Sequence, residues 1–403
     1  MPILHIFGKE LIDENSILQL GRCVGEGDLA VLTADAHYGY GHPIGGVVAY
    51  KNKVSLSGVG FDIACGNKAV RTDLMAKDID VSAIMDEIVR RISFGVGRPN
   101  NEPIDHEVFD NIRLADFQPQ RQLMSLARDQ LGTVGSGNHY VDLFEDEQGW
   151  LWIGVHFGSR GFGHKTAMGF IALSQGMNFN DRAKEGSMDA KPVLFDVDSA
   201  IGQDYLAAMH LAGEYAYAGR DAVVDKVLSI LGAKSNFAVH NHHNFTWKEH
   251  HFGEEFWVVR KGCTPAFPNQ QSFVGATMFD EAVILEGLET ETARNGLFST
   301  VHGAGRVMSR NEAAGKKKWV KDQTGKKSPV VVGRGKVNFE EVKHLAKAQG
   351  IELRGGAADE APQCYKKLDQ VLDCHRDTIR ILHRLRPIGV AMAGAEVYDP
   401  YKD

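Results

Sequence analysis

The sequence predicts a soluble α+β protein in which mixed β-sheets are surrounded by helices. Short runs of β-branched and aromatic residues flanked by glycine are typical of strands, as in residues 46–50, 150–155 and 256–259. Helical patterns lie among these runs, but strands and helices do not alternate as regularly as they do in a doubly wound α/β sheet. No Pro- or Ser-rich linker and no internal repeat divides the chain. We therefore expect one domain that covers residues 1–403.

Three segments carry helical patterns. Over residues 368–385, apolar side chains recur at spacings of three and four until Pro387 ends the pattern, which predicts one amphipathic helix. Residues 83–92 predict a shorter helix and residues 199–231 a longer, interrupted helical region. The glycines that interrupt the longer region are Gly202, Gly213 and Gly219.

The composition favours a globular protein in a reducing compartment. With 43% hydrophobic and 24% charged residues, the chain fits neither disordered nor collagen-like proteins. No segment reaches the roughly 18 consecutive apolar residues of a membrane span, and residues 1–20 show no secretory signal. The 5 cysteines form no CxxC pair, which argues against a disulfide framework or a structural zinc knuckle. We therefore expect a cytoplasmic protein without a membrane partner.

Glycine-rich loops surround most of the side chains that could carry chemistry. Glycine allows tight turns and a close approach of the backbone to a phosphate or a metal. Five such loops in one chain suggest that they form one shared site. The loops are residues 35–41, 60–66, 135–139, 156–161 and 302–306.

Several of these loops carry possible metal ligands. Asp62 and Cys65 lie three residues apart, so both can reach one centre, although for this pair alone a buried cysteine beside a turn-forming aspartate is the favoured explanation. His139, His156 and His243 add imidazoles, and the alternative for each is a hydrogen-bonded core histidine. Such a set suits Mn, Fe, Co or Zn better than Mg or Ca, and an open catalytic centre is the better interpretation.

The loop at residues 302–306 suggests phosphate chemistry. His302 and Arg306 flank flexible glycines, and Arg160 lies in a similar loop. Arginine binds phosphate oxygens in a bidentate manner, and a neutral imidazole can attack phosphorus. The alternative for His302 is an ordinary loop histidine. The chain contains no GxxxxGK[ST] motif, so a P-loop nucleotide fold is not expected.

A basic segment follows this loop and could bind a polyanion. The formal net charge is −7, so a nucleic-acid partner would need a local basic patch. Between residues 316 and 336 only Asp322 opposes the positive charges, although such a run is often just a solvated loop. The basic residues are Lys316, Lys317, Lys318, Lys321, Lys326, Lys327, Arg334 and Lys336.

Taken together, eight ordered sequence blocks resemble the RtcB family of RNA ligases. They extend over almost the whole chain, and the resemblance implies the fold of that family, built around a central metal site. The blocks are residues 35–45, 60–66, 135–140, 156–161, 242–244, 251–255, 260–262 and 302–306.

The resemblance implies roles for individual residues. His302 matches the histidine that becomes guanylylated, and Cys65 matches a thiolate that bridges two Mn²⁺ ions. The other implied metal ligands are Asp62 and His139 for one ion, and His156 and His243 for the other. The implied nucleotide contacts are Asn138, Tyr140, Asp142, Asn244, Ser272, Arg306 and Tyr365. The implied substrate contacts are Asp35, Arg160, Lys316, Lys317 and Lys318.

The implied activity is GTP-dependent RNA ligation, in tRNA splicing or RNA repair. The enzyme would join a 3′-phosphate or 2′,3′-cyclic phosphate end to a 5′-hydroxyl end through a histidine–GMP intermediate. We expect a monomer, with an activating partner allowed. Two alternatives remain open at this point, a metal-dependent 2′,3′-cyclic phosphodiesterase and a non-catalytic protein that binds RNA ends.

Overall fold

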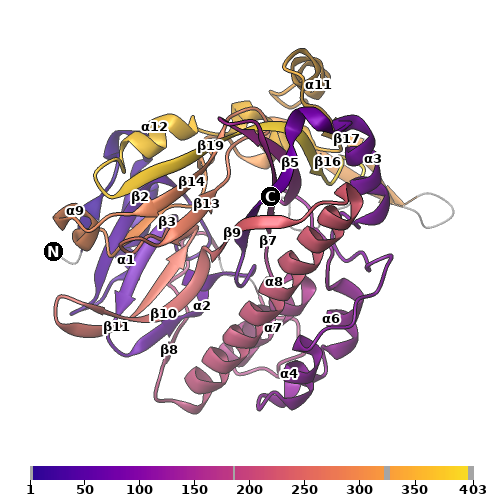
Figure 1. Ribbon diagram of the computed structural model, residues 1–403. Coiled ribbons are helices and arrows are strands. Elements are labelled where there is room, and N and C mark those ends of the chain that lie inside the picture. The colour runs from indigo at the N-terminus through magenta and orange to yellow at the C-terminus, as the bar shows by residue number, and fades with distance from the viewer. Residues whose placement is uncertain (1–2, 185–186, 322–326, 398–403) are drawn as a thin grey trace.

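The computed structural model describes residues 3–184, 187–321 and 327–397. It confirms the α+β fold, because two large β-sheets and several helices make up this part of the chain. Figure 1 shows one sheet on the left, the second extending from the upper left to the centre right, and the long helix α8 (Ala200–Leu231) running beneath them. One domain over residues 1–403 stays a prediction.

The first sheet has five strands. The pair at one edge, β1 and β2, is parallel, and the other neighbouring strands are antiparallel. It is formed by segments from opposite halves of the chain. In spatial order the strands are β1 (Ile3–Ile6), β2 (Leu29–His37), β3 (Ile44–Tyr50), β11 (Glu254–Lys261) and β10 (Asn244–His251).

The second sheet has eight strands and is antiparallel along its main path. In spatial order these are β13 (Gln271–Val274), β14 (Ala282–Gly287), β19 (Ile379–Met392), β6 (Tyr140–Asp146), β7 (Trp150–Phe157), β5 (Gly66–Met75) and β9 (Ser235–His242), and β18 (Glu352–Arg354) pairs in parallel with β19. Strand β9 is followed almost directly by β10, so the chain passes from one sheet to the other there.

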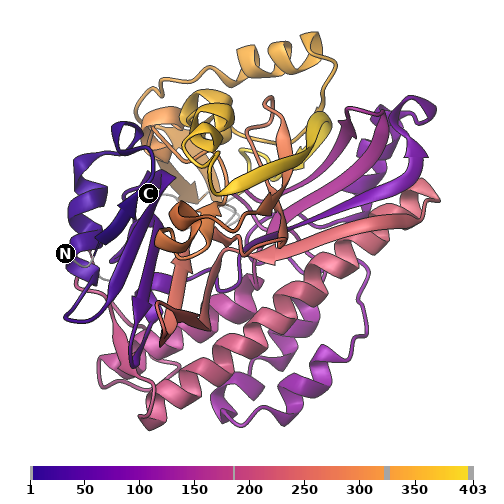
Figure 2. The ribbon, with the colours of Figure 1, turned by 60° about the vertical axis from the view of Figure 1, so that its left-hand side comes forward.

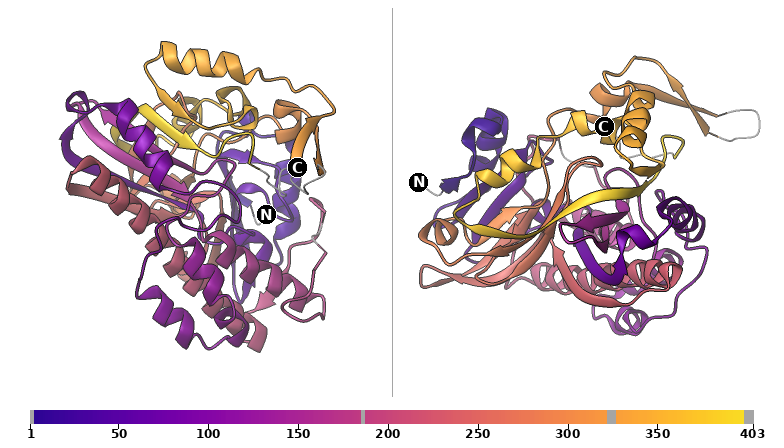
Figure 3. Two further views of the ribbon diagram at one scale, coloured as in Figure 1. Left: turned by 90° about the vertical axis from the view of Figure 1, so that its right-hand side faces the viewer. Right: turned by 45° about the horizontal axis from the view of Figure 1, so that its top comes forward.

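Three strand pairs and the remaining helices complete the described structure. The pairs are β4 (Lys53–Ser55) with β8 (Leu194–Asp196), β12 (Cys263–Pro265) with β15 (Ser299–Val301), and β16 (Lys317–Lys321) with β17 (Lys327–Val331). The other α-helices are α1 (Glu14–Cys23), α2 (Leu56–Val59), α3 (Val81–Arg91), α4 (Val108–Leu114), α5 (Gln118–Arg121), α6 (Met124–Gln130), α7 (Arg160–Ser174), α9 (Glu291–Asn295), α10 (Arg310–Ala314), α11 (Phe339–Ala348) and α12 (Leu368–Asp373). In the right-hand view of Figure 3, β16 and β17 extend away from the body of the protein.

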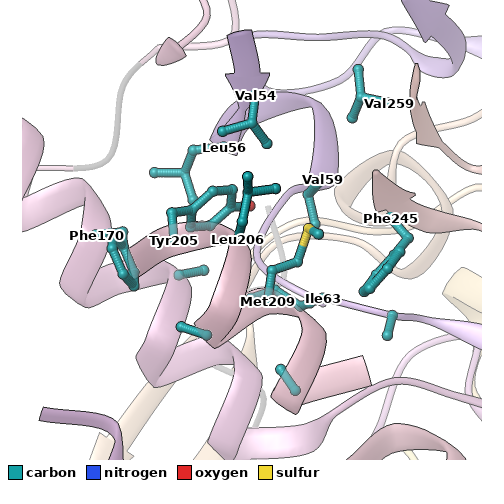
Figure 4. Packing of buried hydrophobic residues seen from close by; sticks show 14 of the residues in the cluster. Val54, Leu56, Val59, Ile63, Phe170, Tyr205, Leu206, Met209, Phe245 and Val259 are labelled. Carbon is teal, nitrogen blue, oxygen red and sulfur yellow. The ribbon is translucent and has the colours of Figure 1, made fainter. Parts of the chain in front are cut away.

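Helix α8 joins the two halves of the core. In its first part, Tyr205 and Met209 pack in a buried cluster with Val59 and Phe245, near the first sheet (Figure 4). In its last part, Val223 and its neighbours pack in a separate cluster with side chains of β6 and β7. Burial of each such side chain contributes about 1.5–3 kcal/mol. The helix, about 48 Å long at 1.5 Å per residue, therefore fixes the junction between the sheets, as Figure 2 shows from a second side.

The three glycines within this helix do not interrupt it. The expectation of breaks at these positions is wrong, because α8 continues from Ala200 to Leu231. A Cβ atom at Gly202 would lie 2.0 Å from the carbonyl oxygen of Asp196, and one at Gly213 would lie 3.0 Å from the Phe245 ring. These two glycines allow neighbouring segments to approach the helix, and packing offsets their low helix propensity.

The predicted helix over residues 368–385 is also wrong in most of its length. Helix α12 ends at Asp373, and residues from Ile379 onward belong to β19. This strand pairs with β14 on one side and with β6 on the other. Arg380, Arg384 and Arg386 are exposed, but a β-bulge at Leu382 shifts the alternation of side chains. Ile381 and Leu382 therefore pack against different core clusters, and the irregular spacing of the apolar residues imitates a helix.

The other predicted elements agree with the structure. The three predicted strand runs lie in β3, β7 and β11, and the short helix predicted at residues 83–92 corresponds to α3. Within the described residues, we find no helix with the length and apolar character needed to cross a bilayer.

Because Gly219 has ordinary space around it, Gly219→Ala should stabilise the protein. A Cβ atom there would meet Phe157 at 3.5 Å and Leu131 at 3.9 Å, which are normal contacts. Removing backbone freedom from the unfolded chain should raise the free energy of unfolding by about 0.5–1 kcal/mol. Chemical denaturation measures this change. Gly202→Ala is the matched control and should destabilise, and equal losses in both variants would contradict the prediction.

Candidate functional site

The ends of four neighbouring strands bring the predicted metal ligands together. Gly66, the first residue of β5, pairs with Phe157 at the end of β7 and with His242 at the end of β9. Tyr140, the first residue of β6, pairs with His156. This register places the adjoining loops at one end of the second sheet. The ligands that it gathers there are Cys65, His139, His156 and His243.

These side chains form two groups that share one thiol. The Cys65 Sγ lies 3.3 Å from His156 Nε2 and 3.7 Å from His139 Nε2. The His139 Nε2 is in turn 3.1 Å from Asp62 Oδ2. One group is Cys65, His156 and His243, and the other is Asp62, Cys65 and His139. In each group the possible ligand atoms all lie within 4.8 Å of one another, which suits two cations that share the sulfur.

The backbone near Asp62 is shaped to allow this approach. A Cβ atom at Gly158 would lie 2.2 Å from Asp62 Oδ1, so only glycine fits next to the carboxylate. Ala64, directly before Cys65, has a φ of 57°, which is a strained conformation for a residue other than glycine. The loop thus holds Asp62 and Cys65 in a conformation that their local sequence does not favour.

The chemistry of the donor set fits a divalent transition metal. Burial and the nearby Asp62 carboxylate raise the pKa of the Cys65 thiol, while burial lowers the pKa values of His156 and His243. The imidazoles are therefore neutral, as metal ligands must be, and a cation would favour the thiolate. The buried His243 Nδ1 has no hydrogen-bond partner in the described part of the chain. Metal coordination is one way to satisfy such a group.

His302 stands next to this centre and is held by a buried carboxylate. Its ring centroid is 4.9 Å from that of His243. Its Nδ1 lies 2.7 Å from Asp35 Oδ2, and its backbone N–H donates to the same oxygen at 3.0 Å. Thr33 Oγ1 donates to the other Asp35 oxygen at 2.6 Å. Burial alone would raise the pKa of Asp35, but the charge and hydrogen bonds of His302 outweigh it and lower that pKa to about 2.

This contact changes the role that we expected for Asp35. The carboxylate is completely buried beneath His302, so it offers no surface to a substrate. Because the ionised carboxylate accepts the Nδ1 proton, Nε2 is the ring nitrogen that stays available. Asp35 therefore orients the His302 ring and does not itself line the cavity.

A cavity of about 280 Å³ opens over both the cation ligands and His302. Most of the residues predicted for the site line it, although they come from distant parts of the sequence. These residues are Asp62, Cys65, Asn138, His139, Tyr140, Asp142, His156, His243, Asn244, His302, Arg306 and Tyr365.

One wall of the cavity carries paired charges. Arg306 donates to the Tyr365 hydroxyl at 2.8 Å, and its guanidinium lies 4.9 Å above the same ring. Tyr365 also donates to Glu360, which pairs with Arg310. Sequence reasoning missed Arg310 and Glu360. The only local signal for Glu360 is the Gly355–Gly356 pair a few residues earlier, while Arg310 has no such signal.

The part of the cavity near Tyr140 is enclosed and partly polar. Tyr140 and Asp142 are buried, and Tyr140 Oη and Asp142 Oδ1 have no hydrogen-bond partner among the described residues. Burial raises the pKa of Asp142 well above its usual range. Unpartnered polar atoms that line a cavity are suited to contact a ligand with matching hydrogen-bonding groups.

Two other expected contacts lie elsewhere. Ser272 is fully buried in β13 and donates to the Pro265 carbonyl at 3.3 Å, so we do not find the expected nucleotide contact. Residues 275–278, just after this strand, line the cavity instead. Arg160 lies beside His139, with its guanidinium 3.4 Å from Nδ1, and is absent from the described lining of the cavity.

The basic segment is described only in part. Lys316 is exposed, and the backbones of Lys317 and Lys318 belong to β16, but the side chains of these two lysines lie outside the described structure. Their RNA contacts stay predictions.

The histidine-dense run at residues 240–244 serves two purposes. His243 belongs to the cation centre, whereas His240 and His242 point to helix α8 and contact Arg220. Asn244 accepts a hydrogen bond from the backbone N–H of Gly262 at 2.7 Å and donates to the Asp62 carbonyl at 3.3 Å. It thereby ties the loop before Cys65 to the wall of the cavity.

Comparisons with known proteins agree with this arrangement. The family model described as tRNA-splicing ligase RtcB matches residues 22–118 and 106–393. The RNA-splicing ligase RtcB of Escherichia coli (strain K12) is 29% identical, over 88% of this chain and 87% of that protein. The tRNA-splicing ligase RtcB of Archaeoglobus fulgidus is 31% identical, over 90% of this chain and 87% of that protein. An RNA-splicing ligase RtcB homolog of Entamoeba histolytica is 28% identical, over 96% of this chain and 86% of that protein.

Because both ligand groups contain Cys65, Cys65→Ala should weaken both cation sites at once. The fold should survive, since the side chain is small and alanine fills a similar position. Manganese titration of the purified protein measures the number of ions bound, and circular dichroism checks the fold. Cys263→Ala, which removes a buried thiol outside both groups, is the control. A folded Cys65→Ala protein with two ions at unchanged affinity would rule out the shared thiol.

Proposed function

This chain belongs to the RtcB family of RNA-splicing ligases, and we propose that it is a GTP- and manganese-dependent ligase of broken RNA. It joins an RNA end with a 3′-phosphate or 2′,3′-cyclic phosphate to an end with a 5′-hydroxyl. The reaction passes through a GMP group on His302.

The observation that carries this proposal is the position of His302. A buried carboxylate orients its ring, and the same cavity contains the candidate ligands of two cations. A protein that only binds RNA ends needs no oriented nucleophile. A phosphodiesterase that only opens cyclic ends needs the cations but no histidine of this kind.

The first step forms a bond between His302 and phosphorus. The Nε2 lone pair attacks the α-phosphorus of GTP, the bond to the β-phosphate oxygen breaks, and pyrophosphate leaves. Asp35 holds the Nδ1 proton throughout and balances the positive charge that develops on the ring. The cations, held by the two groups around Cys65, would supply Lewis-acid polarisation of phosphoryl oxygens.

The next two steps restore the histidine and join the RNA. An oxygen of the RNA 3′-phosphate attacks the phosphorus of the GMP group, which breaks the phosphorus–nitrogen bond and leaves His302 free. The 5′-hydroxyl then attacks the RNA phosphorus, loses its proton and displaces GMP. Water must open a 2′,3′-cyclic end to a 3′-phosphate before these steps.

The wall residues fit the role of nucleotide contacts. Arg306 presents a guanidinium on the same wall as Tyr365, which suits a phosphate or an aromatic base. Asn138 lies next to a cation ligand and can donate to phosphate oxygens. Tyr140 and Asp142 have the unpartnered atoms that base recognition requires. The cytoplasmic location, the monomeric state and an activating partner stay predictions.

A labelling experiment tests the proposal. The full chain is incubated with Mn²⁺ and GTP labelled at the α-phosphate, and we expect acid-labile label on the wild type. His302→Ala should bind manganese but take no label, because only the nucleophile is lost. This variant should still join RNA that already carries a 3′-end guanylate.

Three results would contradict the proposal. Label on the His302→Ala protein would place the nucleophile elsewhere. An unlabelled wild type that opens cyclic ends with Mn²⁺ would favour the phosphodiesterase, and RNA-end binding without either reaction would favour the non-catalytic protein. His344→Ala, on the exposed surface of α11, is a control for the general effect of removing an imidazole.

The basic hairpin should act on RNA and not on GTP. Replacing Lys316, Lys317 and Lys318 by Gln should weaken RNA binding, and each lost phosphate contact should lower the slope of log affinity against log salt by about 0.7–0.9. Labelling of His302 should continue, because these lysines are not among the described residues that line the cavity. Binding isotherms at several salt concentrations measure the effect. Unchanged affinity and slope would mean that the lysines form an ordinary solvated segment.

A further inference from the structure

A buried arginine lies next to the candidate cation centre and is not among the described residues that line the cavity. Arg220 of α8 is fully buried and makes four polar contacts with other segments. Its Nη1 donates to the carbonyl oxygens of Ala64 at 3.0 Å and Phe157 at 2.6 Å. Its Nη2 lies 3.0 Å from His242 Nδ1, and its Nε donates to His240 Nε2 at 2.8 Å.

Three of these contacts are with direct neighbours of cation ligands. Ala64 precedes Cys65, Phe157 follows His156, and His242 precedes His243. One guanidinium therefore connects the three segments that supply the shared thiol and both histidines of one ligand group. Its planar fork can reach several fixed acceptors at once, which no other side chain does as well.

The contact with Ala64 also stabilises a strained conformation. At a φ of 57°, a residue other than glycine costs roughly 1–3 kcal/mol unless its surroundings hold it. The Ala64 carbonyl accepts from Arg220, and the Ala64 N–H donates to the Asn244 carbonyl at 2.8 Å. Both backbone groups of this residue are therefore fixed, and with them the position of Cys65.

The charge of Arg220 has no direct carboxylate partner among the described residues. The nearest acid that its contacts reach is Asp221, which pairs with His240 at 3.3 Å and with Lys68 at 2.5 Å. The guanidinium also lies 5.2 Å from the Tyr217 ring centroid. Burial of a charge without an ion pair is unfavourable, so packing alone does not explain an arginine here.

We infer that Arg220 is a positioning residue for the cation centre. By bonding to the neighbours of Cys65, His156 and His243, it holds the three strand ends at the separation that two cations sharing one sulfur require. The inference rests on the cation centre of the proposed function. Arg220 touches neither the cavity nor the reacting groups in the described structure, so it acts only through these neighbours.

The test compares two buried arginines. Arg220→Lys keeps a positive charge but cannot reach all four acceptors. Arg260→Lys is the matched control, because Arg260 is equally buried but binds Glu249, Ser299 and Leu297, which adjoin no cation ligand. Manganese titration gives the stoichiometry and affinity for each full-length variant, and thermal melting gives the stability. Loss of contacts around a metal ligand typically weakens metal binding by about 10–100-fold.

We expect both variants to melt earlier than the wild type, but only Arg220→Lys to bind manganese about 10–100-fold more weakly. Wild-type affinity and stoichiometry in Arg220→Lys would overturn the inference, as would an equal loss in Arg260→Lys. If Arg220→Lys does not fold, His240→Ala, which removes only the acceptor of the Arg220 Nε, replaces it under the same criteria. A wild type that binds no manganese would refute the cation centre itself, and the inference with it.

Discussion

The thiol of Cys65 belongs to both candidate ligand groups, and the arrangement of the strands makes this possible. The other members of the two groups reach the sulfur from several directions, which one loop cannot supply. The antiparallel register of β6, β7, β5 and β9 solves the problem, because it places four strand ends side by side. The glycine at position 158 then admits the Asp62 carboxylate.

His302, the proposed nucleophile, is positioned by a different part of the fold. Asp35 lies in β2 of the first sheet, whereas most of the cation ligands adjoin the second sheet. His302 follows the short strand β15 and meets His243 at the junction of the two sheets. The site therefore exists only where the sheets meet. Helix α8, which packs near both sheets, fixes that junction, and the chemistry depends on this packing as much as on the residues in the cavity.

The sequence was informative where glycine and a reactive side chain occur together. Cys65, His139, His156 and His302 all lie in such loops, and the structure gathers them around one cavity. Local sequence could not predict contacts made across the fold. The bond from Asp35 to His302 joins residues 267 positions apart, and nothing near Asp35 indicates that its carboxylate is buried.

The errors have a similar physical origin. Strand β19 was mistaken for a helix because a β-bulge at Leu382 shifts the alternation of side chains on which the distinction depends. Ser272 lies only a few residues before the segment 275–278 that lines the cavity. However, its hydroxyl points to the Pro265 carbonyl, because side chains alternate between the two faces of a strand. Predicting either feature requires knowledge of which strands become neighbours.

Three histidines, His240, His242 and His243, show how close in sequence a structural role and a proposed metal-binding role can lie. In an extended strand, successive side chains point to opposite faces, so His240 and His242 share the face that meets α8, while Asn241 on the other face bonds to Phe273. His243 comes after the end of the strand and is free of this alternation.

Burial keeps His240 and His242 neutral by lowering their pKa values, so their ring nitrogens can contact the Arg220 guanidinium. The same burial makes His243 a neutral imidazole with an unpartnered nitrogen in the described structure. One buried environment therefore produces both a support for an arginine and a candidate metal ligand, and the position of each histidine relative to the end of β9 decides between them.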